Sequence, residues 1–400
     1  MTLDELKRET LQELTDDILH FWMDRTVDPQ NGGFYGQITG QGVLMPQSEK
    51  GVILNSRILW TFSSAYRLLA IKEYLLMATR AKDYLLRCFY DHELKGVYWT
   101  VDFEGKPLET KKQIYALSFA LYGLSEYHRA TGDEESLRYA VELFETIEKY
   151  SFDSDKNGYW EALTRDWQPI EDMRLSDKDE NLCKTTNTHL HIMEAYMNLY
   201  RVWKDERLRN QLRNLICLFR DRIVDPETGH LKLFFDDEWN TQNNLVSYGH
   251  DIETSWLLHE AAMVLGDEDL LAQIEKYALL LALAADEGLN KDGSMNYEMS
   301  MTDFHLVTDR HWWVQAENVV GHVNLYQHFG NEEALQRATE GWAYIKQHLI
   351  DNRDGEWFWS VSEQGVPNRL DDKVGLWKCP YHNSRMCMEI LERFREDRIA

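Results

Sequence analysis

The chain has 400 residues and a formal net charge of −25, and it contains 14 Trp, 20 Tyr and 15 Phe but only 7 Pro. Its 44% hydrophobic share supports a large core and excludes disordered, collagen-like and low-complexity classes. The acidic balance argues against nucleic acid or an anionic membrane as a partner, because both recruit basic surfaces, so the expected ligand is a neutral small molecule.

The sequence predicts neither a membrane segment nor secretion. The longest apolar run, residues 277–285, is less than half of the roughly 20 residues that span a bilayer. Residues 1–9 mix both charge signs and lack the apolar stretch of a signal peptide. The cysteines are scattered, without a Cys-x-x-Cys pair, and we interpret them as reduced thiols. We therefore expect a cytoplasmic protein that acts as a monomer.

One short pattern recurs six times along the chain: a turn opened by Asp or Asn, then a glycine, then an alternating run with aromatic or β-branched residues. The turn glycines lie 62 to 71 residues apart, and they are Gly33, Gly96, Gly158, Gly229, Gly293 and Gly355. Several copies continue into a second turn, as at residues 102–107 and 362–367. This arrangement predicts a short β-hairpin in each repeat.

The stretches between the hairpins are long enough for two helices each. In the second repeat, Leu117, Leu121 and Leu124 follow the i, i+4, i+7 spacing of one helical face. Helix pairs cannot bury their apolar faces alone, so they must stack into an open solenoid or a closed ring. Six repeats without a polar capping unit favour the ring. We therefore predict an all-α fold, a single (α/α)6-barrel domain over residues 1–400 with about twelve helices; an open solenoid that binds a ligand is the alternative.

In such a ring, the starts of alternate helices face one end of the central cavity, so distant side chains converge there. The second helices of the pairs begin with Arg57, Tyr115, His191, His250, Trp313 and His382. Five tryptophans fall on these helices or at their starts: Trp60, Trp256, Trp312, Trp313 and Trp377. Histidines beside an arginine and aromatic rings favour acid–base chemistry on a polar organic ligand with an apolar face.

Helical spacing sharpens the expectation within two of these segments. Asn187, His191 and Glu194 share one face, whereas His189 points about 200° away and is expected to pack in the core. His250 and Glu253 are three residues apart, so we expect the carboxylate to fix the imidazole and favour its protonated form.

Metal and nucleotide sites are not expected. The His-x-His spacing at residues 189–191 brings two rings to one ion on a strand rather than on a helix, and the sequence has no His-Glu-x-x-His motif. It also has no glycine-rich phosphate loop after a strand. The predicted chemistry therefore uses no metal and no cofactor.

Four segments, residues 187–191, 247–253, 309–317 and 377–383, closely resemble the cellobiose 2-epimerases of the N-acylglucosamine 2-epimerase superfamily. Residues 32–36 and 51–60 do so as well, and the resemblance runs in order from about Leu14 to the C-terminus. It implies an (α/α)6 barrel that interconverts glucose and mannose configurations at the reducing end of β-1,4 disaccharides such as cellobiose, lactose and mannobiose. In this branch of the superfamily the reaction needs neither metal nor nucleotide.

The resemblance also implies roles for individual residues. His250 and His382 would be the acid–base pair at the sugar C2, assisted by His191. Trp313 and Trp377 would stack on the two sugar rings, and Asp179 would contact the second ring. The remaining implied residues, which would hold sugar hydroxyls or orient the histidines, are Arg57, Tyr115, Asn187, Glu253 and Glu317.

Other activities remain open at this point. A mannose 2-epimerase would use the same residues, and an aldose–ketose isomerase would return the proton to C1 instead of C2. An inverting glycosidase would need two carboxylates about 6.5 to 9.5 Å apart across the cavity, with Asp251, Glu253 and Glu317 as candidates. A sugar-binding protein without chemistry would need only the aromatic rings.

Overall fold

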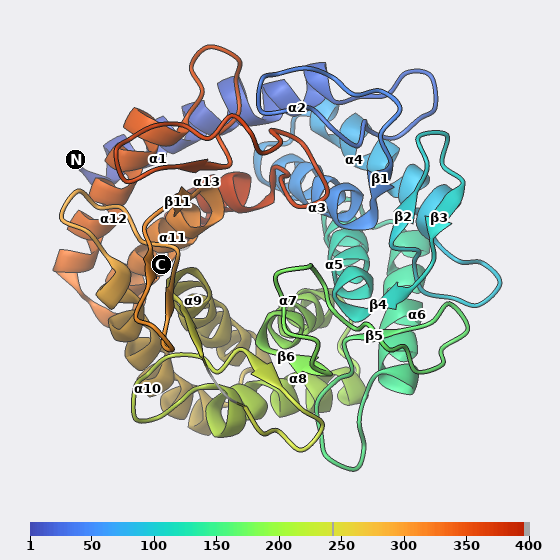
Figure 1. Ribbon diagram of the computed structural model, residues 1–400. Coiled ribbons are helices and arrows are strands. Elements are labelled where there is room, and N and C mark those ends of the chain that lie inside the picture. Colours follow the sequence, from blue (N-terminus) through green and yellow to red (C-terminus); the bar gives the residue numbers. More distant parts are fainter. Residues whose placement is uncertain (242–243, 396–400) are drawn as a thin grey trace.

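The computed structural model describes residues 1–241 and 244–395, and within them helices form two concentric rings (Figure 1). The inner ring consists of α3 (Val52–Leu69), α5 (Ile114–Thr131), α7 (Thr186–Val202), α9 (Tyr248–Leu265), α11 (Trp312–Phe329) and α13 (Tyr381–Arg393). The outer ring consists of α1 (Leu3–Gln12) with α2 (Leu19–Arg25), α4 (Lys72–Tyr84), α6 (Glu134–Tyr150), α8 (Glu206–Leu218), α10 (Glu268–Ala285) and α12 (Glu332–Tyr344). The predicted (α/α)6 barrel is confirmed.

Shorter helical turns accompany the outer ring. Wide π-helical turns join α1 to α2 or end an outer helix: η1 (Glu13–Ile18), η2 (Leu85–Phe89), η3 (Phe219–Ile223) and η5 (Ile345–Leu349). A 3₁₀ turn, η4 (Asp286–Gly288), follows α10. No helix of the described residues combines the length and apolarity needed to cross a membrane.

Burial separates the two rings. The inner helix α5 buries Leu117, Leu121 and Leu124 completely, and most of its other residues are also buried. The outer helix α6 buries only one stripe, which includes Leu143 and Ile147, and exposes acidic residues on its other side. An outer helix thus needs one apolar face, whereas an inner helix is covered by its neighbours all round.

The last repeat closes the ring against the first. Ile38 forms an antiparallel bridge with Val374, and the Trp22 indole donates a 2.5 Å hydrogen bond to Glu356. Helix α13 packs against α3 and against α1. These contacts across the chain ends exclude the open solenoid.

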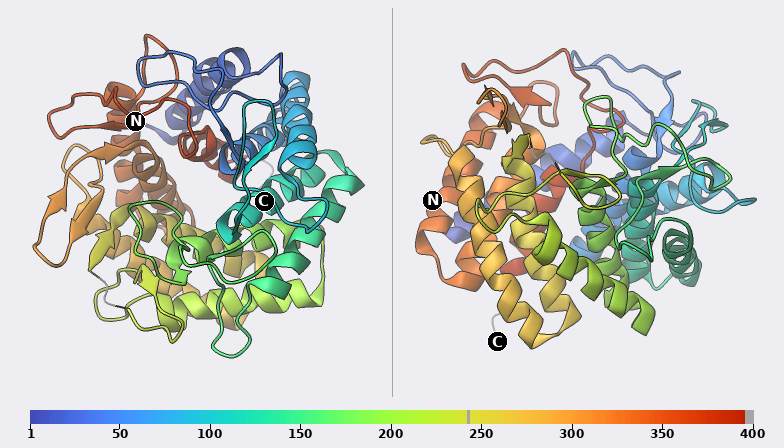
Figure 2. Two further views of the ribbon diagram at one scale, coloured as in Figure 1. Left: turned by 45° about the vertical axis from the view of Figure 1, so that its right-hand side comes forward. Right: turned by 60° about the horizontal axis from the view of Figure 1, so that its bottom comes forward.

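Short strands tie each repeat to the next. The strand before an inner helix pairs with the hairpin that follows that helix pair, as Lys50–Gly51 pairs with Thr100–Val101. The strands are β1 (Lys50–Gly51), β2 (Thr100–Val101), β3 (Pro107–Glu109), β4 (Lys112–Gln113), β5 (Ala162–Leu163), β6 (Lys184–Thr185), β7 (Phe234–Phe235), β8 (Leu245–Ser247), β9 (Glu298–Ser300), β10 (Leu306–Val307), β11 (Arg310–His311) and β12 (Ser360–Val361). The hairpins gather at one end of the barrel (Figure 2).

The backbone conformation explains why glycine occurs at this position of each repeat. All six turn glycines have φ between 61° and 90°, the left-handed region that other residues rarely adopt. At Gly96 a Cβ atom would also come within 2.9 Å of the Trp167 ring. The pattern found in the sequence is therefore a backbone requirement of the turn.

The acidic residue of the repeat also has a partner. In four repeats it forms a buried ion pair with a lysine that precedes the next inner helix, directly in three repeats and across a short loop at Lys373. The same lysine donates to a carbonyl of the turn. The pairs are Asp28–Lys50 (2.8 Å), Asp91–Lys112 (2.9 Å), Asp153–Lys184 (2.8 Å) and Asp351–Lys373 (2.5 Å). Each pair fixes a hairpin to the start of an inner helix, which is where the candidate site lies.

Candidate active site

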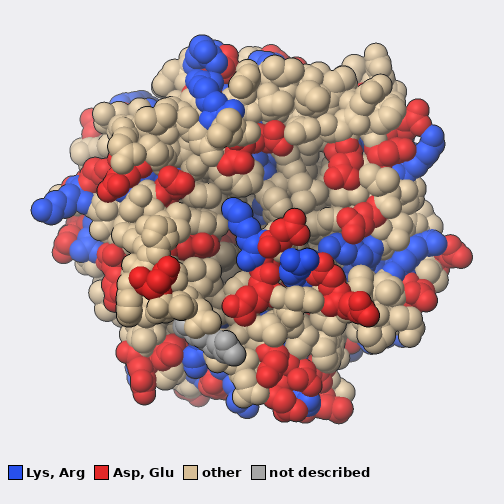
Figure 3. Space-filling view, viewed as in Figure 1, with Lys and Arg blue, Asp and Glu red and all other residues tan. Residues whose placement is uncertain are grey.

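The six side chains expected to converge come from the first two turns of the six inner helices, at the hairpin end of the barrel. We call this end of the channel the mouth, and its residues are Arg57, Tyr115, His191, His250, Trp313 and His382. Seen from the hairpin side, the surface is hollowed near its centre, and charged side chains of both signs border the hollow (Figure 3).

Arg57 is held against the wall of the mouth by aromatic rings. Its Nη2 donates a 2.8 Å hydrogen bond to the Tyr115 hydroxyl. The guanidinium carbon lies 4.3 Å from the centre of the Phe119 ring and 4.8 Å from that of Tyr381. These cation–π contacts give a buried positive charge a fixed orientation.

His191 is oriented by the carboxylate one helical turn away. Its Nδ1 lies 2.8 Å from Glu194 Oε2, as the shared face on α7 predicts. Burial opposes the ionisation of Glu194, but Arg385 and His191 outweigh it and lower the pKa of this carboxyl to about 2. The carboxylate is therefore ionised and accepts a hydrogen bond from the Nδ1–H group. Asn187, half-buried, lies one turn before His191 on the same helix.

His382 is oriented in the same way from the other side of the ring. Its Nδ1 lies 2.7 Å from Glu317 Oε1, and the other oxygen of Glu317 accepts a 2.9 Å hydrogen bond from the Trp256 indole. Burial, and then the charges of Arg57 and Arg385, hold the pKa of His382 well below its usual value. His382 is thus a neutral imidazole whose Nε2 carries the lone pair.

The predicted contact between His250 and Glu253 is wrong. The partner of His250 Nδ1 is Ser247 Oγ at 2.8 Å. Helix α9 directs Glu253 one turn deeper into the channel, where its Oε1 accepts a 2.6 Å hydrogen bond from Arg385. The expected protonated form is also disfavoured, because burial, and then the charge of His191, lower the pKa of His250 to about 4.

Two half-buried tryptophans lie at the mouth, and one of them contacts these histidines. The Trp313 ring centre lies 4.8 Å from that of His250 and 5.7 Å from that of His382. Gly249 makes room for it, since a Cβ there would come within 2.6 Å of the indole. Trp377 packs against Trp99 at 5.9 Å and against Tyr115 at 6.0 Å.

The chain matches one protein family over most of its length. The model of the N-acylglucosamine 2-epimerase (GlcNAc 2-epimerase) family matches residues 33–384. The chain belongs to this family.

Its relatives within the family share its full length. A cellobiose 2-epimerase of Bacteroides fragilis is 61% identical over 390 residues, which cover 97% of this chain and 100% of the relative. Another, of Ruminococcus albus, is 43% identical, with coverage of 96% and 98%. The solved structure of the cellobiose 2-epimerase from Bacillus thermoamylovorans B4167 superposes with a TM-score of 0.94 at 40% identity, covering 98% of this chain and 100% of that one.

Among the other expected residues, Asp179 lies apart from the histidines, on the loop that leads to β6. Its Oδ2 accepts a 2.9 Å hydrogen bond from the Ser176 backbone, and burial raises the pKa of its carboxyl. His189 is the packing histidine expected from its spacing. Its Nε2 accepts from the Tyr159 backbone at 2.9 Å, and its Nδ1 lies 2.6 Å from the Thr185 carbonyl.

The carboxylates do not have the arrangement of an inverting glycosidase. Glu253 and Glu317 accept from the same nitrogen, Arg385 Nη2, each at 2.6 Å, so their Oε1 atoms lie side by side rather than across a cavity. Asp251 faces away, with its oxygens on His230 (2.7 Å) and on the Leu231 backbone (2.9 Å).

The cluster of Glu253, Glu317 and His382 also has the composition of a metal site, with ligand atoms within 4.8 Å of one another. The Arg385 guanidinium already supplies a positive charge to this cluster, paired with both carboxylates. Sequence reasoning missed Arg385, Tyr381 and Ser247. For Arg385 a signal existed, because it follows His382 by one helical turn on α13.

Proposed function

We propose that this protein is a 2-epimerase that converts the reducing-end glucose of cellobiose and related β-1,4 disaccharides to mannose and back. The observation that carries the proposal is the set of three mouth histidines, two of them with Nδ1 on a glutamate, in a chain 61% identical to a cellobiose 2-epimerase. The Nε2 atoms of these histidines make no hydrogen bond within the described part of the chain, so they are available to a bound sugar.

The chemistry begins with ring opening of the reducing-end sugar to its aldehyde, which makes the hydrogen on C2 acidic. A neutral histidine removes this proton, and the electrons of the C–H bond form the C1–C2 double bond of an enediolate. The histidine on the opposite face, which has taken up a proton from water before the cycle, then returns a proton to C2, and the carbonyl re-forms at C1. The first histidine ends the cycle protonated and the second neutral, and exchange with water resets the pair. The configuration at C2 is inverted, and no electrons are gained or lost.

His250 and His382 are the acid–base pair in this proposal. They come from α9 and α13 and contact the same indole, Trp313, so a sugar stacked there would meet both rings. Their lowered pKa values favour the neutral form, which is the form that accepts a proton. In the reverse reaction the two histidines exchange roles.

Arg57, and His191 in its protonated form, stabilise the negative charge that develops on the enediolate oxygen. The guanidinium is fixed and buried, and in a site of low dielectric a fixed charge stabilises a developing oxyanion more than water does. Both residues contact Tyr115: the ring centres of His191 and Tyr115 lie 5.1 Å apart, and Arg57 donates to the Tyr115 hydroxyl. Arg57 and His191 therefore act on the same side of the cavity.

The remaining residues bind and orient. Trp313 stacks on the reacting ring and Trp377 on the second ring, through the apolar faces of the sugars. Glu317 holds His382 directly, and Glu253 lies 4.0 Å from the same Nδ1. Tyr115, Asn187 and Asp179 bind hydroxyl groups.

We also infer that the enzyme is a cytoplasmic monomer that uses neither a metal nor a nucleotide. The free state of all five cysteines supports a reducing compartment. Dialysis against a chelator is expected to leave the rate unchanged.

One experiment tests the activity. Cellobiose is incubated with the protein in deuterium oxide, and the reducing-end signals are followed by NMR. A mannose signal with deuterium at C2 is the expected product. A ketose would indicate aldose–ketose isomerisation, free glucose a hydrolase, and an unchanged spectrum a binding protein, and each of these outcomes contradicts the proposal.

A further inference from the structure

One buried cation lies directly beneath the mouth histidines. Arg385 of α13 is 1% exposed, and its guanidinium reaches three other inner helices. Its Nη1 donates to Glu194 of α7, and its Nη2 donates to Glu253 of α9 and Glu317 of α11, each at 2.6 Å. The Tyr381 hydroxyl lies 2.5 Å from Nη1.

Two of these carboxylates are the ones that hold histidines. Glu194 binds His191 Nδ1 at 2.8 Å, and Glu317 binds His382 Nδ1 at 2.7 Å. A single glutamate side chain therefore connects Arg385 to each imidazole, although the two histidines come from α7 and α13. No other arginine of the described chain bridges carboxylates of both histidines.

The charges of this cluster do not balance without Arg385. Three glutamates share one guanidinium in a space closed by the Trp256 ring at 4.8 Å and the Tyr381 ring at 4.4 Å. Burial and the neighbouring Glu317 already raise the pKa of Glu253 to about 8, and burial also raises the pKa of Glu317, although Arg385 opposes this effect. Without the cation, mutual repulsion and desolvation would drive protons onto Glu194 and Glu317 as well.

Protonation of these glutamates would change the histidines. An ionised carboxylate only accepts, so it holds the hydrogen on Nδ1 and leaves the lone pair on Nε2. A carboxylic acid can instead donate to Nδ1, and the imidazole then carries its hydrogen on Nε2 and cannot take a proton from the sugar there.

We propose that Arg385 is a positioning residue that keeps Glu194 and Glu317 ionised and in place, so that His191 and His382 both present a basic Nε2 to the sugar. This inference rests on the proposed epimerase activity. In this proposal one residue, Arg385, sets the same tautomer in two histidines that lie on different helices.

The first test compares substitutions of two buried arginines on the same helix. Arg385→Met is expected to lower kcat about 100-fold with KM within about threefold, because the histidines lose orientation but the sugar contacts remain. Arg385→Lys keeps the charge and should recover at least tenfold of this loss. Arg393→Met is the control, since Arg393 lies two turns further on and pairs with Glu389 at 2.8 Å and Glu260 at 3.5 Å; its kcat should stay within about threefold.

A kcat within threefold of the wild type in Arg385→Met would overturn the proposal, as would a loss that appears in KM alone or a Lys variant no better than Met. Equal losses in Arg393→Met and Arg385→Met would also overturn it, since burial of an arginine would then explain the effect.

The second test needs no turnover and no variant of Arg385. Nitrogen-15 NMR of histidine-labelled wild-type protein, with signals assigned by His191→Asn and His382→Asn, reports which ring nitrogen carries the hydrogen. We expect Nδ1–H on both residues at neutral pH, and Nε2–H on both would overturn the proposal even if Arg385→Met does not fold. If the wild type shows no exchange at C2, the epimerase activity fails, while this measurement still tests the tautomers on which the positioning role depends.

Discussion

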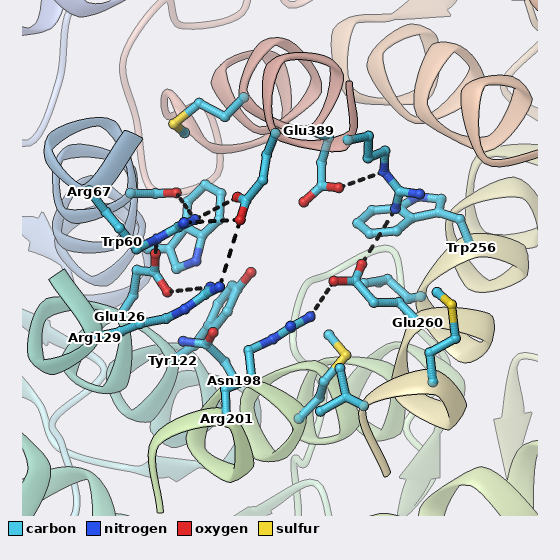
Figure 4. Close-up of a pocket in the computed structure, with 18 of the residues that line it drawn as sticks. Trp60, Arg67, Tyr122, Glu126, Arg129, Asn198, Arg201, Trp256, Glu260 and Glu389 are labelled. Atoms are coloured by element: carbon cyan, nitrogen blue, oxygen red, sulfur yellow. Dashed lines mark hydrogen bonds and ion pairs between the residues drawn. The ribbon is translucent and has the colours of Figure 1, made fainter. Parts of the chain in front are cut away.

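The same six inner helices build two very different ends of one barrel. Their first turns form the mouth, with its histidines. Their last turns form a far end around a cavity of about 380 Å³ (Figure 4), in which the helix colours run around the ring in the opposite sense to Figure 1. Its charged residues are Arg67, Glu126, Arg129, Arg201, Glu260, Glu389, Glu392 and Arg393.

At the far end, charged groups of opposite sign face one another. Arg67 bonds Glu126 and Glu392, each at 2.7 Å, and Arg201 pairs with Glu260. The arginines lie near the C-terminal ends of their helices, where positive charge complements the helix dipole. These pairs join helices that are distant in the sequence, so the far end serves the closure of the ring.

At the mouth the pairing is incomplete. Each histidine has one ring nitrogen held by a neighbour, while its Nε2 makes no hydrogen bond within the described chain. One helical scaffold thus has separate regions for stability and for chemistry. Paired charges at the far end stabilise the ring, whereas imidazoles at the mouth that have one ring nitrogen without a partner in the described chain can react with a substrate.

The largest expected effect is the loss of activity when a mouth histidine is removed. His382→Ala should lower C2 exchange by about 10³-fold, because it removes one of the two proton-transfer groups, and His250→Ala should do the same. Deuterium incorporation at C2, followed by NMR, measures the rate. Unchanged far-ultraviolet circular dichroism would show that the fold is retained.

The matched control is a histidine at the far end. His328 lies at the end of α11 and lines the far cavity, so His328→Ala should keep the exchange rate within about threefold. Retained turnover in either mouth variant would contradict the acid–base assignment. A loss in His328→Ala would contradict the separation of the two ends.

The second prediction concerns the stability that the ion pairs of the far end provide. Glu126 is 1% exposed and holds Arg67 at 2.7 Å and Arg129 at 3.4 Å. Glu126→Gln should lower the free energy of unfolding by about 2 kcal/mol, since two arginines lose a charged partner. Urea denaturation measures the change, and kcat should not move.

Its control is Glu145→Gln. Glu145 pairs with Arg207 at 3.4 Å on the surface, with 51% of its side chain exposed, so its loss should be barely detectable. Equal destabilisation by the two variants would argue against a structural role specific to the far end.

The sequence predicts much of this architecture because its signals are local and repeated. A glycine with positive φ in each turn, such as Gly96, and apolar spacing, such as that of Leu117 and Leu121, depend on a few neighbouring residues. The repeat also places one mouth residue on each inner helix. The buried Lys–Asp pairs were missed, although aligning the repeats would have placed Lys50 and Lys112 at the same position.

The depth of a side chain along the barrel axis is harder to predict from the sequence than its position around the ring. Trp60 and Trp256 lie on mouth helices, yet both line the far cavity, since each lies two turns or more into its helix. Glu253 was paired with His250 because they are neighbours on α9, but contacts among helices settle its partner, Arg385. Such contacts join residues more than a hundred positions apart, and periodicity carries no information about them.

A third prediction separates the two sugar rings within the mouth. Trp313 contacts the histidines, whereas Trp377 contacts Trp99 and Tyr115. Trp377→Ala should raise KM for cellobiose about fivefold, the value of one lost stacking contact of about 1 kcal/mol, with little change in kcat. Mannose, which has no second ring, is the control substrate. An equal rise in KM for both sugars would place Trp377 on the reacting ring instead.

The smallest expected effect is the response of the mouth to acid. A general base must be deprotonated, and burial followed by the charge of His191 lowers the pKa of His250 to about 4, with that of His382 also well below its usual value. The second histidine must be protonated, and acid favours that form, so the exchange rate should not fall between pH 7 and pH 5.5. It should fall only at lower pH, where the base also takes up a proton. Burial, and then the charge of Arg393, also lower the pKa of His328 to about 4, but its titration at the far end should affect stability alone. His328→Ala should consequently keep the wild-type profile of rate against pH. A wild-type rate that halves near pH 6.5 would show that a catalytic histidine has an ordinary pKa and that burial in the mouth does not tune it.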